Sequence, residues 1–546
     1  GKQILINFIN GSKLGAGVSI LQDESTFSTY GDVYKFVSVR LASMNNVNDL
    51  LSYGDYRFKD TINKQNGDRV FVDNTSSNWK IYEKEDPYTT TLLNSPDTTN
   101  DQDFGYRIVG REDGRTLVVS APSVGQGTIH FFFRRSADAG TAFTVQNSLT
   151  MTENDDTSSR LGQSLSISSD ENFIVAGAPF TNAIGFDGST RFTDSGLVKT
   201  YIWNQSTFSY ILLSTITGPS DGSTNLENAN FGFSTAIAEP TDSAGRTTTP
   251  KLMFVSAPGH SNDTGIVHMY DWNVGADGST YDTWTQRVAI QSNDPDGGQR
   301  FGHRVKVNDN GDILAVSSKA TGVAGKVEIF TRSSTKNDDS TTYAWTHKQT
   351  LTGASADGST LNTQFGEDIA MSKDGTRLFV TAPGYDKTNQ ADAGALYYYK
   401  FNDDGSTNTY TLKQTVEAPD LQTNMKFGTS IDCNQAGNRL TIGAEKLGNF
   451  REMAFDSGAT TFDLQDTTVV DQNIGSGGVY TATMYDTLFV VDDRLVTTKV
   501  SSNDDFGRGV FINDRGVYVG APEDDSSSGV SNDGTVTSFE LNTLAS

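Results

Sequence analysis

A Phe-Gly pair that returns seven times restricts the fold of this chain more than any other feature. The first residue of the pair is Phe104, Leu161 (Leu in place of Phe), Phe231, Phe301, Phe365, Phe427 and Phe506, at intervals of 57 to 79 residues. Self-similarity on this scale is typical of repeat architectures, in which each copy is one supersecondary unit that stacks on its neighbours. The chain is therefore best analysed as an array.

Each copy contains four strand-like segments in the same order. In the fourth copy, an alternating stretch at residues 304–307 is followed by an Asn-Gly turn and an apolar strand that ends at Ser318. A third strand opens with Gly325, and a more polar fourth strand covers residues 345–351. Four short strands joined by tight turns form one blade of a β-propeller. The sequence thus predicts an all-β, seven-bladed β-propeller of four-stranded antiparallel blades that start near residues 104, 161, 231, 301, 365, 427 and 506.

The repeated Phe is expected at equivalent buried positions between adjacent blades. A single blade cannot bury both of its faces, so stacking has to supply the core. The Gly that follows is expected where backbones approach closely near the crowded axis. The fourth strand, which carries more charge and Thr, suits an outer rim that must resist edge-to-edge pairing.

The two ends of the repeat region predict how the ring closes. The last copy ends near Glu540 without a fourth strand, whereas residues 88–93 precede the first Phe-Gly with the alternation of a rim strand. We expect residues 88–93 to complete the final blade. Residues 70–84 are then surplus strands or, in the alternative, part of an eighth blade that starts near Tyr53. The predicted domains are a short N-terminal β segment or connector at 1–52 and the propeller at 53–546.

The Phe-Gly pair, followed further along each copy by Ser/Gly-Ala-Pro, resembles the FG-GAP repeat of integrin α-subunit propellers and many microbial surface proteins. The resemblance covers about residues 104–540 and implies a propeller with an adhesive or structural role. The loop style, and the phrase at residues 67–74 leading to Trp79, also resemble large virion structural proteins of marine tailed phages.

Charge and cysteine content exclude some classes of function. The formal net charge of −25 repels phosphate backbones and anionic lipid, so neither nucleic-acid binding nor membrane insertion is expected. Cys433 is the single cysteine, which excludes intramolecular disulfides and thiolate clusters. It is expected to be a buried, inert thiol.

Few residues point to catalytic or metal chemistry. Integrin-type blades often carry a calcium loop, and the nearest approach here is Asp309, Asn310 and Asp312 around Gly311. Calcium prefers six to eight oxygen ligands, so an ordinary hairpin turn is the competing interpretation. The five histidines show no metal-ligand spacing, and no nucleophile elbow or phosphate loop is present. We therefore expect no enzyme and no required cofactor, and calcium, if bound, at one or two turns of which Asp309–Asp312 is the first candidate.

Two long approaches to third strands, at residues 180–196 and 449–478, are candidates for a binding face. Their aromatic residues Phe186, Phe192, Phe450 and Phe462 would be the anchors for a glycan or a protein. The alternative is a pair of hairpins without a binding role. The leading hypothesis is a non-catalytic structural or adhesion module, extracellular or on a virion surface, such as a phage tail or fibre component or a microbial adhesin. A glycan- or protein-binding receptor module is the second hypothesis, and a propeller hydrolase is a distant third.

Overall fold

The computed structural model describes most of the repeat region and part of the sequence before it. The described residues are 69–73, 80–84, 88–97, 102–135, 141–151, 158–184, 191–207, 209–218, 226–240, 251–273, 283–319, 324–332, 344–355, 362–387, 390–402, 408–419, 423–447, 451–455, 464–468, 477–485, 487–495, 504–524 and 532–541. The predicted N-terminal segment at 1–52 lies outside them.

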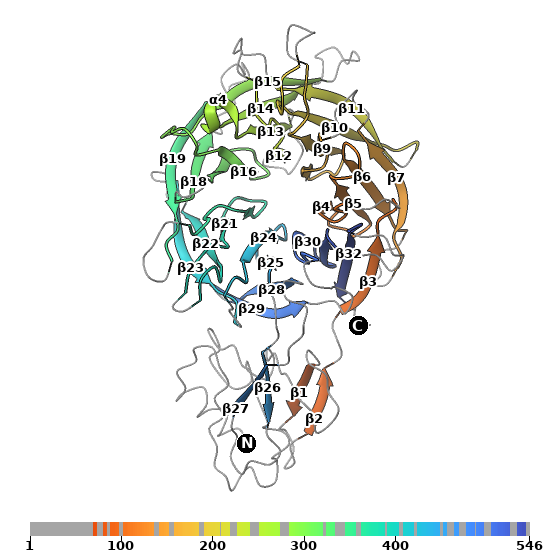
Figure 1. Cartoon of the computed structure of the whole chain (residues 1–546), viewed down its shortest axis with the longest axis vertical. Helices are drawn as coiled ribbons and strands as arrows, with labels where there is room; N and C mark the ends of the chain where they lie inside the picture. The colour runs from red at the N-terminus through yellow and green to blue at the C-terminus, as the bar shows by residue number, and fades with distance from the viewer. Residues whose placement is uncertain are drawn as a thin grey trace.

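Seven four-stranded antiparallel sheets are arranged around a ring (Figure 1). Blade I contains β4 (Ile108–Gly110), β5 (Thr116–Ala121), β6 (Thr128–Phe133) and β7 (Thr144–Thr150). Blade II contains β8 (Ser164–Ile167), β9 (Phe173–Ala178), β10 (Leu197–Asn204) and β11 (Ser209–Thr217). Blade III contains β12 (Thr235–Ala238), β13 (Leu252–Ala257), β14 (Ile266–Asn273) and β15 (Thr283–Ile290), with the short turn α4 (His260–Asp263) between β13 and β14.

The remaining blades repeat the same order. Blade IV contains β16 (Phe301–Val307), β17 (Ile313–Ser318), β18 (Lys326–Arg332) and β19 (Trp345–Thr352). Blade V contains β20 (Ile369–Met371), β21 (Arg377–Ala382), β22 (Ala395–Asn402) and β23 (Thr409–Val416). Blade VI contains β24 (Phe427–Cys433), β25 (Arg439–Ala444), β28 (Gly478–Tyr485) and β29 (Leu488–Leu495). Blade VII contains β30 (Gly509–Ile512), β31 (Gly516–Ala521), β32 (Thr535–Leu541) and, from the start of the chain, β3 (Tyr88–Asn94).

The ring closes as the sequence predicts, with residues 88–93 in the final blade. β3 pairs antiparallel with β32 along its whole length, with Thr91 opposite Ser538. β1 (Arg69–Asp73) and β2 (Lys80–Lys84) pair only with each other, and both lie outside the ring (Figure 1). The seven-bladed prediction is confirmed. The eight-bladed alternative is wrong, because this hairpin pairs with neither of the blades that flank the seam.

Each blade runs from an apolar second strand to a polar rim. All six residues of β17 are buried, because both of its faces are covered by neighbouring blades. In the rim strand β19, half-buried and exposed residues alternate over most of the length. Polar side chains on the exposed face discourage pairing with another chain.

The hydrophobic core is divided among the interfaces between blades. The described residues form seven clusters, each drawn from two adjacent blades and each containing one residue of the repeated pair. Phe301, for example, packs with Phe254 of blade III and Phe330 of blade IV. All seven repeat residues are fully buried: Phe104, Leu161, Phe231, Phe301, Phe365, Phe427 and Phe506.

Backbone conformation around the pair also repeats. The Gly of every pair has a positive φ, between 86° and 100°, and the residue before every pair has a φ between 53° and 59°. A second glycine, which opens each third strand, lies against the backbone of the pair in the next blade. A Cβ on Gly265 would come within 2.1 Å of the carbonyl oxygen of Phe301. The same contact joins Gly534 of blade VII to Phe104 of blade I, so it runs around the whole ring.

Among the described residues, no helix has the length and apolar character needed to cross a bilayer.

Candidate functional site: the axial mouth

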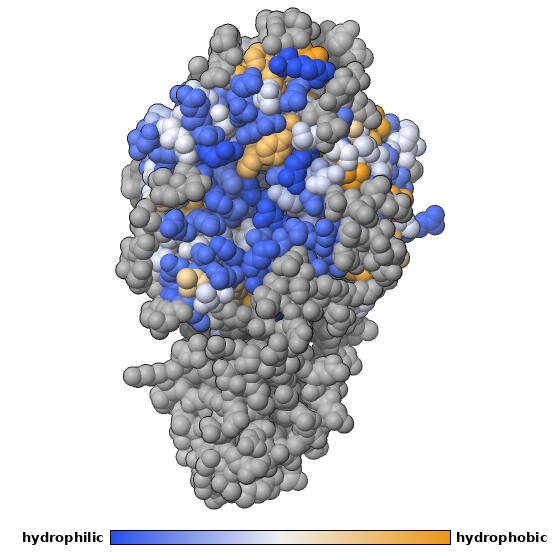
Figure 2. All heavy atoms as spheres, in the orientation of Figure 1, coloured by the Kyte–Doolittle hydropathy of each residue, from blue (hydrophilic) through white to orange (hydrophobic). Residues whose placement is uncertain are grey.

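A cavity of about 310 Å³ lies along the axis of the propeller, lined by inner-strand residues of all seven blades. A pocket in this position is formed by every repeat at once, and its size is at the lower end for small-molecule sites. The face seen in Figure 2 is mainly hydrophilic toward the centre of the ring.

The two residues that follow each Phe-Gly pair lie at one end of this cavity, and in blades I to VI at least one of the two lines it. We call this end the mouth. In blades IV and VI the ladder between the first and second strands is irregular just after the pair. Such a bulge re-aims side chains that regular alternation would send to opposite faces. The mouth residues in blade order are Tyr106-Arg107, Gln163-Ser164, Phe233-Ser234, His303-Arg304, Glu367-Asp368, Thr429-Ser430 and Arg508-Gly509.

The mouth is braced by hydroxyl and carboxylate groups that bind backbone. Ser317 Oγ accepts a hydrogen bond of 3.0 Å from the backbone N–H of Arg304. Thr381 Oγ1 likewise accepts one of 2.9 Å from the backbone N–H of Asp368. Asp368 in turn accepts from the backbone N–H of Ile431 in the next blade, at 3.2 Å. The side chains of the mouth are thus positioned by neighbouring blades as well as by their own.

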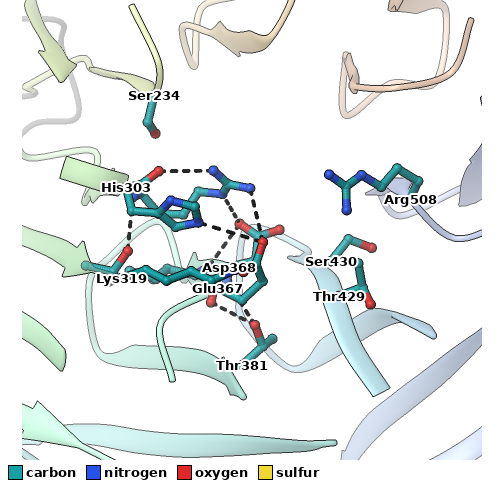
Figure 3. Close-up of polar contacts among 12 residues, drawn as sticks. Ser234, His303, Lys319, Glu367, Asp368, Thr381, Thr429, Ser430 and Arg508 are labelled. Carbon is teal, nitrogen blue, oxygen red and sulfur yellow. Dashed lines mark hydrogen bonds and ion pairs between the residues drawn. The ribbon is translucent and has the colours of Figure 1, made fainter. Parts of the chain in front are cut away.

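One half of the mouth is a network of paired charges centred on Glu367 (Figure 3). Glu367 forms an ion pair with Lys319 and lies 3.7 Å from His303 Nε2, while Arg304 Nε lies 3.3 Å from Asp368. Burial would raise the pKa of Glu367, but the adjacent His303 ring and the charges of Lys319 and Arg304 hold it well below its usual value. Burial, reinforced by the charge of Arg304, lowers the pKa of His303 to about 4, so this ring is neutral near pH 7.

The other half of the mouth is cationic and surrounds Tyr106. The Tyr106 hydroxyl accepts hydrogen bonds from Gln163 Nε2 at 2.8 Å and from Arg508 Nη2 at 3.4 Å. The guanidinium carbons of Arg107, Arg508 and Arg160 lie 5.0, 5.4 and 5.9 Å from the centre of the Tyr106 ring. Figure 3 shows Arg508 on the far side of Thr429 and Ser430 from Glu367 and Asp368.

The opposite end of the cavity is acidic. Burial, with repulsion from Asp432 and Asp514, raises the pKa of Glu112 to about 7. Burial also raises the pKa of Asp432 to about 6, although its carboxylate accepts a 3.0 Å hydrogen bond from the backbone N–H of Ile512. The two ends of the axial cavity therefore differ in charge.

The calcium candidate at Asp309, Asn310 and Asp312 has the hydrogen bonding of a self-contained turn. The Asp312 carboxylate accepts from the side-chain amides of Asn308, at 2.7 Å, and Asn310, at 3.1 Å. The Asp309 carboxylate instead bonds Ser169 and lies 3.4 Å from Lys373. These carboxylates face different partners, and within the described residues no group of three or more His, Cys, Asp or Glu side chains could hold a metal ion. Calcium binding stays a prediction for a chelation experiment.

The aromatic candidates of the long loops are only partly described. Phe192 is half-buried and follows an isolated bridge between Ile184 and Arg191, and its backbone N–H donates to Ala183. Phe186, Phe450 and Phe462 lie outside the described residues. In the second loop, β26 (Arg451–Phe455) pairs with β27 (Leu464–Thr468). Both insertions thus contain antiparallel pairing, as expected if they are hairpins.

Nucleophilic chemistry has little support among the described residues that line the cavity. His303 stands in the mouth beside Glu367 but does not line the cavity. Cys433, the single thiol, is partly exposed to the cavity where the sequence predicted a buried thiol. Burial raises the pKa of its thiol, which keeps it protonated near neutral pH.

Sequence reasoning missed the mouth because it stopped at the Phe-Gly pair. The signal was present: the next two residues are polar in most copies, at positions where an inner strand facing a packed core would be apolar. Aligning the seven copies and comparing those two columns would have identified it.

Comparisons with known proteins add little to this description. No family model matches the chain, and no curated protein matches it, so the FG-GAP and phage-protein resemblances stay predictions. One similar solved structure is a "putative 6-phosphogluconolactonase" from Bacteroides fragilis, with a TM-score of 0.42, 12% identity, and coverage of 76% of this chain and 97% of that one. Another is the β-propeller domain of Cps50 (Swd1) from Myceliophteria thermophila, with a TM-score of 0.43, 8% identity, and coverage of 83% and 100%. By its own strand order and pairing, the chain is a seven-bladed β-propeller.

Proposed function

We propose that this chain is a non-catalytic adhesion module that binds a partner through the axial mouth. The observation that carries the proposal is the mouth itself: a polar, charged opening to a cavity of about 310 Å³, lined in blades I to VI by residues that follow the Phe-Gly pair directly. Taking charged groups out of water costs several kcal/mol per ion, and apolar side chains would often stabilise a ring at least as well. The presence of charges at this place is therefore better explained by binding than by stability.

The partner is proposed to be a cell-surface glycan or a protein of a larger assembly. The acidic exterior and the single cysteine are compatible with an extracellular surface or a virion. The FG-GAP-like repeat supports an adhesin, and the phage-like phrases support a tail or fibre component. Immunogold labelling separates these locations, because labelling of cell surfaces alone would eliminate the virion version.

A cavity-filling variant tests the proposed function. Gln163 lies in the mouth, and Gln163→Trp places a large ring in the cavity; the matched control, Gln146→Trp, makes the same change on the exposed rim strand β7. We expect the wild type and the control to bind the same features on a glycan array or on cells, and Gln163→Trp to lose them. Retained binding by a folded Gln163→Trp protein would show that the mouth is not the binding site.

The non-catalytic part of the proposal has its own test. Incubation with glycosidase, esterase and lactone substrates should give no turnover above background. Turnover that Gln163→Trp abolishes and Gln146→Trp does not would show that the mouth is an active site. It would refute the non-catalytic part of the proposal.

A further inference from the structure

Tyr106 lies among several positive charges at the mouth. Tyr106 is 9% exposed and has three guanidinium groups within 6 Å of its ring centre, at the 5.0, 5.4 and 5.9 Å given above. Two of these cations already have carboxylate partners. Arg508 lies 2.9 Å from Glu445, and Arg160 lies 3.0 Å from Asp103.

Arg107 differs from the other two. In the part of the chain that the structure describes, no carboxylate lies within ion-pair distance of Arg107, whose hydrogen bond is to the carbonyl oxygen of Arg508 at 3.5 Å. Burial and the nearby charge of Arg304 lower the pKa of Arg107. An arginine keeps its proton in proteins, so the lowered pKa reports a buried cation beside other cations, whose charge Tyr106 and Asp368 offset only in part.

The pKa of Tyr106 also indicates an excess of positive charge at this place. Burial raises the pKa of a tyrosine because it disfavours the phenolate, and this is what happens to Tyr201, Tyr270 and Tyr399 elsewhere in the ring. Burial acts on Tyr106 too, but the charges of Arg508 and Arg107 outweigh it and lower the pKa to about 8. The position of the Tyr106 hydroxyl is thus one where negative charge is favourable.

We propose that Arg107, Arg508 and Tyr106 form an anion subsite in the axial mouth that takes the carboxylate of an acidic monosaccharide. Guanidinium forks match a carboxylate in shape and charge. Glu367 and Asp368 are close enough to act on Arg508 and Arg107, and their negative charges disfavour a phosphate dianion more than a monoanion. This subsite rests on the proposed binding role of the mouth and names its ligand class.

The neighbouring mouth residues favour a sugar over an acidic peptide. The hydroxyls of Ser164, Ser234 and Ser430 already bond backbone groups. Gln163 differs, because among the described residues its Oε1 is buried in the cavity lining without a hydrogen-bond partner, and a sugar hydroxyl is a donor that fits it. A cavity of about 310 Å³ also suits one sugar ring better than a length of polypeptide.

Isothermal titration with the full chain tests the subsite. The probes are glucuronate and N-acetylneuraminate, with glucose, inorganic phosphate and a glutamate-terminated peptide as comparisons. We expect the two acidic sugars to bind, and Arg107→Gln to weaken them about tenfold or more. The matched control Arg115→Gln, at an exposed turn of the same blade, should leave binding unchanged.

Tyr106 supplies a spectroscopic readout that a merely structural effect would not move. A bound carboxylate compensates the arginines, so the phenolate absorbance of Tyr106 should titrate at higher pH when glucuronate is present, and this component should vanish in Tyr106→Phe. Equal affinity in wild type and Arg107→Gln, tighter binding of phosphate or of the peptide, or no binding of either acidic sugar would each overturn the inference.

The two proposals fail separately. If the acidic sugars do not bind but Gln163→Trp still abolishes capture of the natural surface, the subsite is wrong and the binding function stands. If the acidic sugars bind through Arg107 and Gln163→Trp retains surface capture, the subsite stands and the adhesion role of the mouth is wrong.

Discussion

At the scale of single residues, the ring depends on glycines at which the backbones of two blades meet. Gly265 opens the third strand of blade III with a φ of 83°, and Phe301 of blade IV lies directly against it. Gly298 has nearly the same φ, 84°, but nothing lies within 4 Å of the position its Cβ would take. Comparing Gly265 with Gly298 therefore separates the cost of backbone strain from the cost of a steric clash.

We expect Gly265→Ala to destabilise the protein by clearly more than Gly298→Ala. Both substitutions place an L side chain at positive φ, which costs about 1–2 kcal/mol. Only the alanine at 265 also clashes with backbone at 2.1 Å, so the interface between blades III and IV has to shift. Urea denaturation of the two variants measures the difference. Equal midpoints would mean that the interface accommodates a methyl group and that close approach is not the reason for this glycine.

At the scale of elements, the blade that joins the two ends of the chain is the point where the ring can open. β32 would be an exposed edge without β3, and an edge strand with unpaired backbone groups exchanges readily and pairs with other chains. The other six blades are each built from one continuous part of the chain. Blade VII alone makes its stability depend on residues far apart in sequence.

Deletion of residues 1–95 should reduce protection of β32 much more than protection of β18 in blade IV. The intact seam makes opening of blade VII cooperative with global unfolding, whereas the truncated chain can open it locally. Hydrogen exchange followed by mass spectrometry compares the two strands in one sample. Equal loss of protection in both would contradict a local role for the seam.

At the scale of the whole molecule, charge is distributed unevenly along the axis of an acidic protein. Arg107, Arg304 and Arg508 lie at the Phe-Gly end. At the other end, Asp432 and Asp514 repel Glu112. Glu171 and Lys373 are also close enough to act on Glu112. Closing the ring brings these like charges together, and stability becomes dependent on pH as a result.

We expect the stability of the wild type to fall as pH rises from about 4.5 to about 7, through the ionisation of Glu112. Its pKa is raised from 4.5 to about 7 on folding, so the folded state binds the proton more tightly, and the stability gained at low pH is lost as pH rises through the folded pKa. Glu112→Gln should therefore raise the melting temperature near pH 8 and have little effect near pH 5. Glu227→Gln, an exposed acid outside the cavity lining, is the control. The same gain at both pH values would contradict repulsion at the acidic end.

The sequence by itself determined the number of blades, the order of their strands and the closure by residues 88–93. These follow from local chemistry: alternation has a period of two, a buried Phe needs two faces to cover it, and a three-stranded end needs a fourth strand. Only the tertiary structure decided what stands at the axis. Tyr106 and Arg508 are 402 residues apart and meet because the ring closes, and no local pattern marks a residue for a contact over that distance. Which polar side chains face one another at the axis then depends on their burial, on neighbouring charges and on the turn of the inner strands. All three depend on the seven blades together.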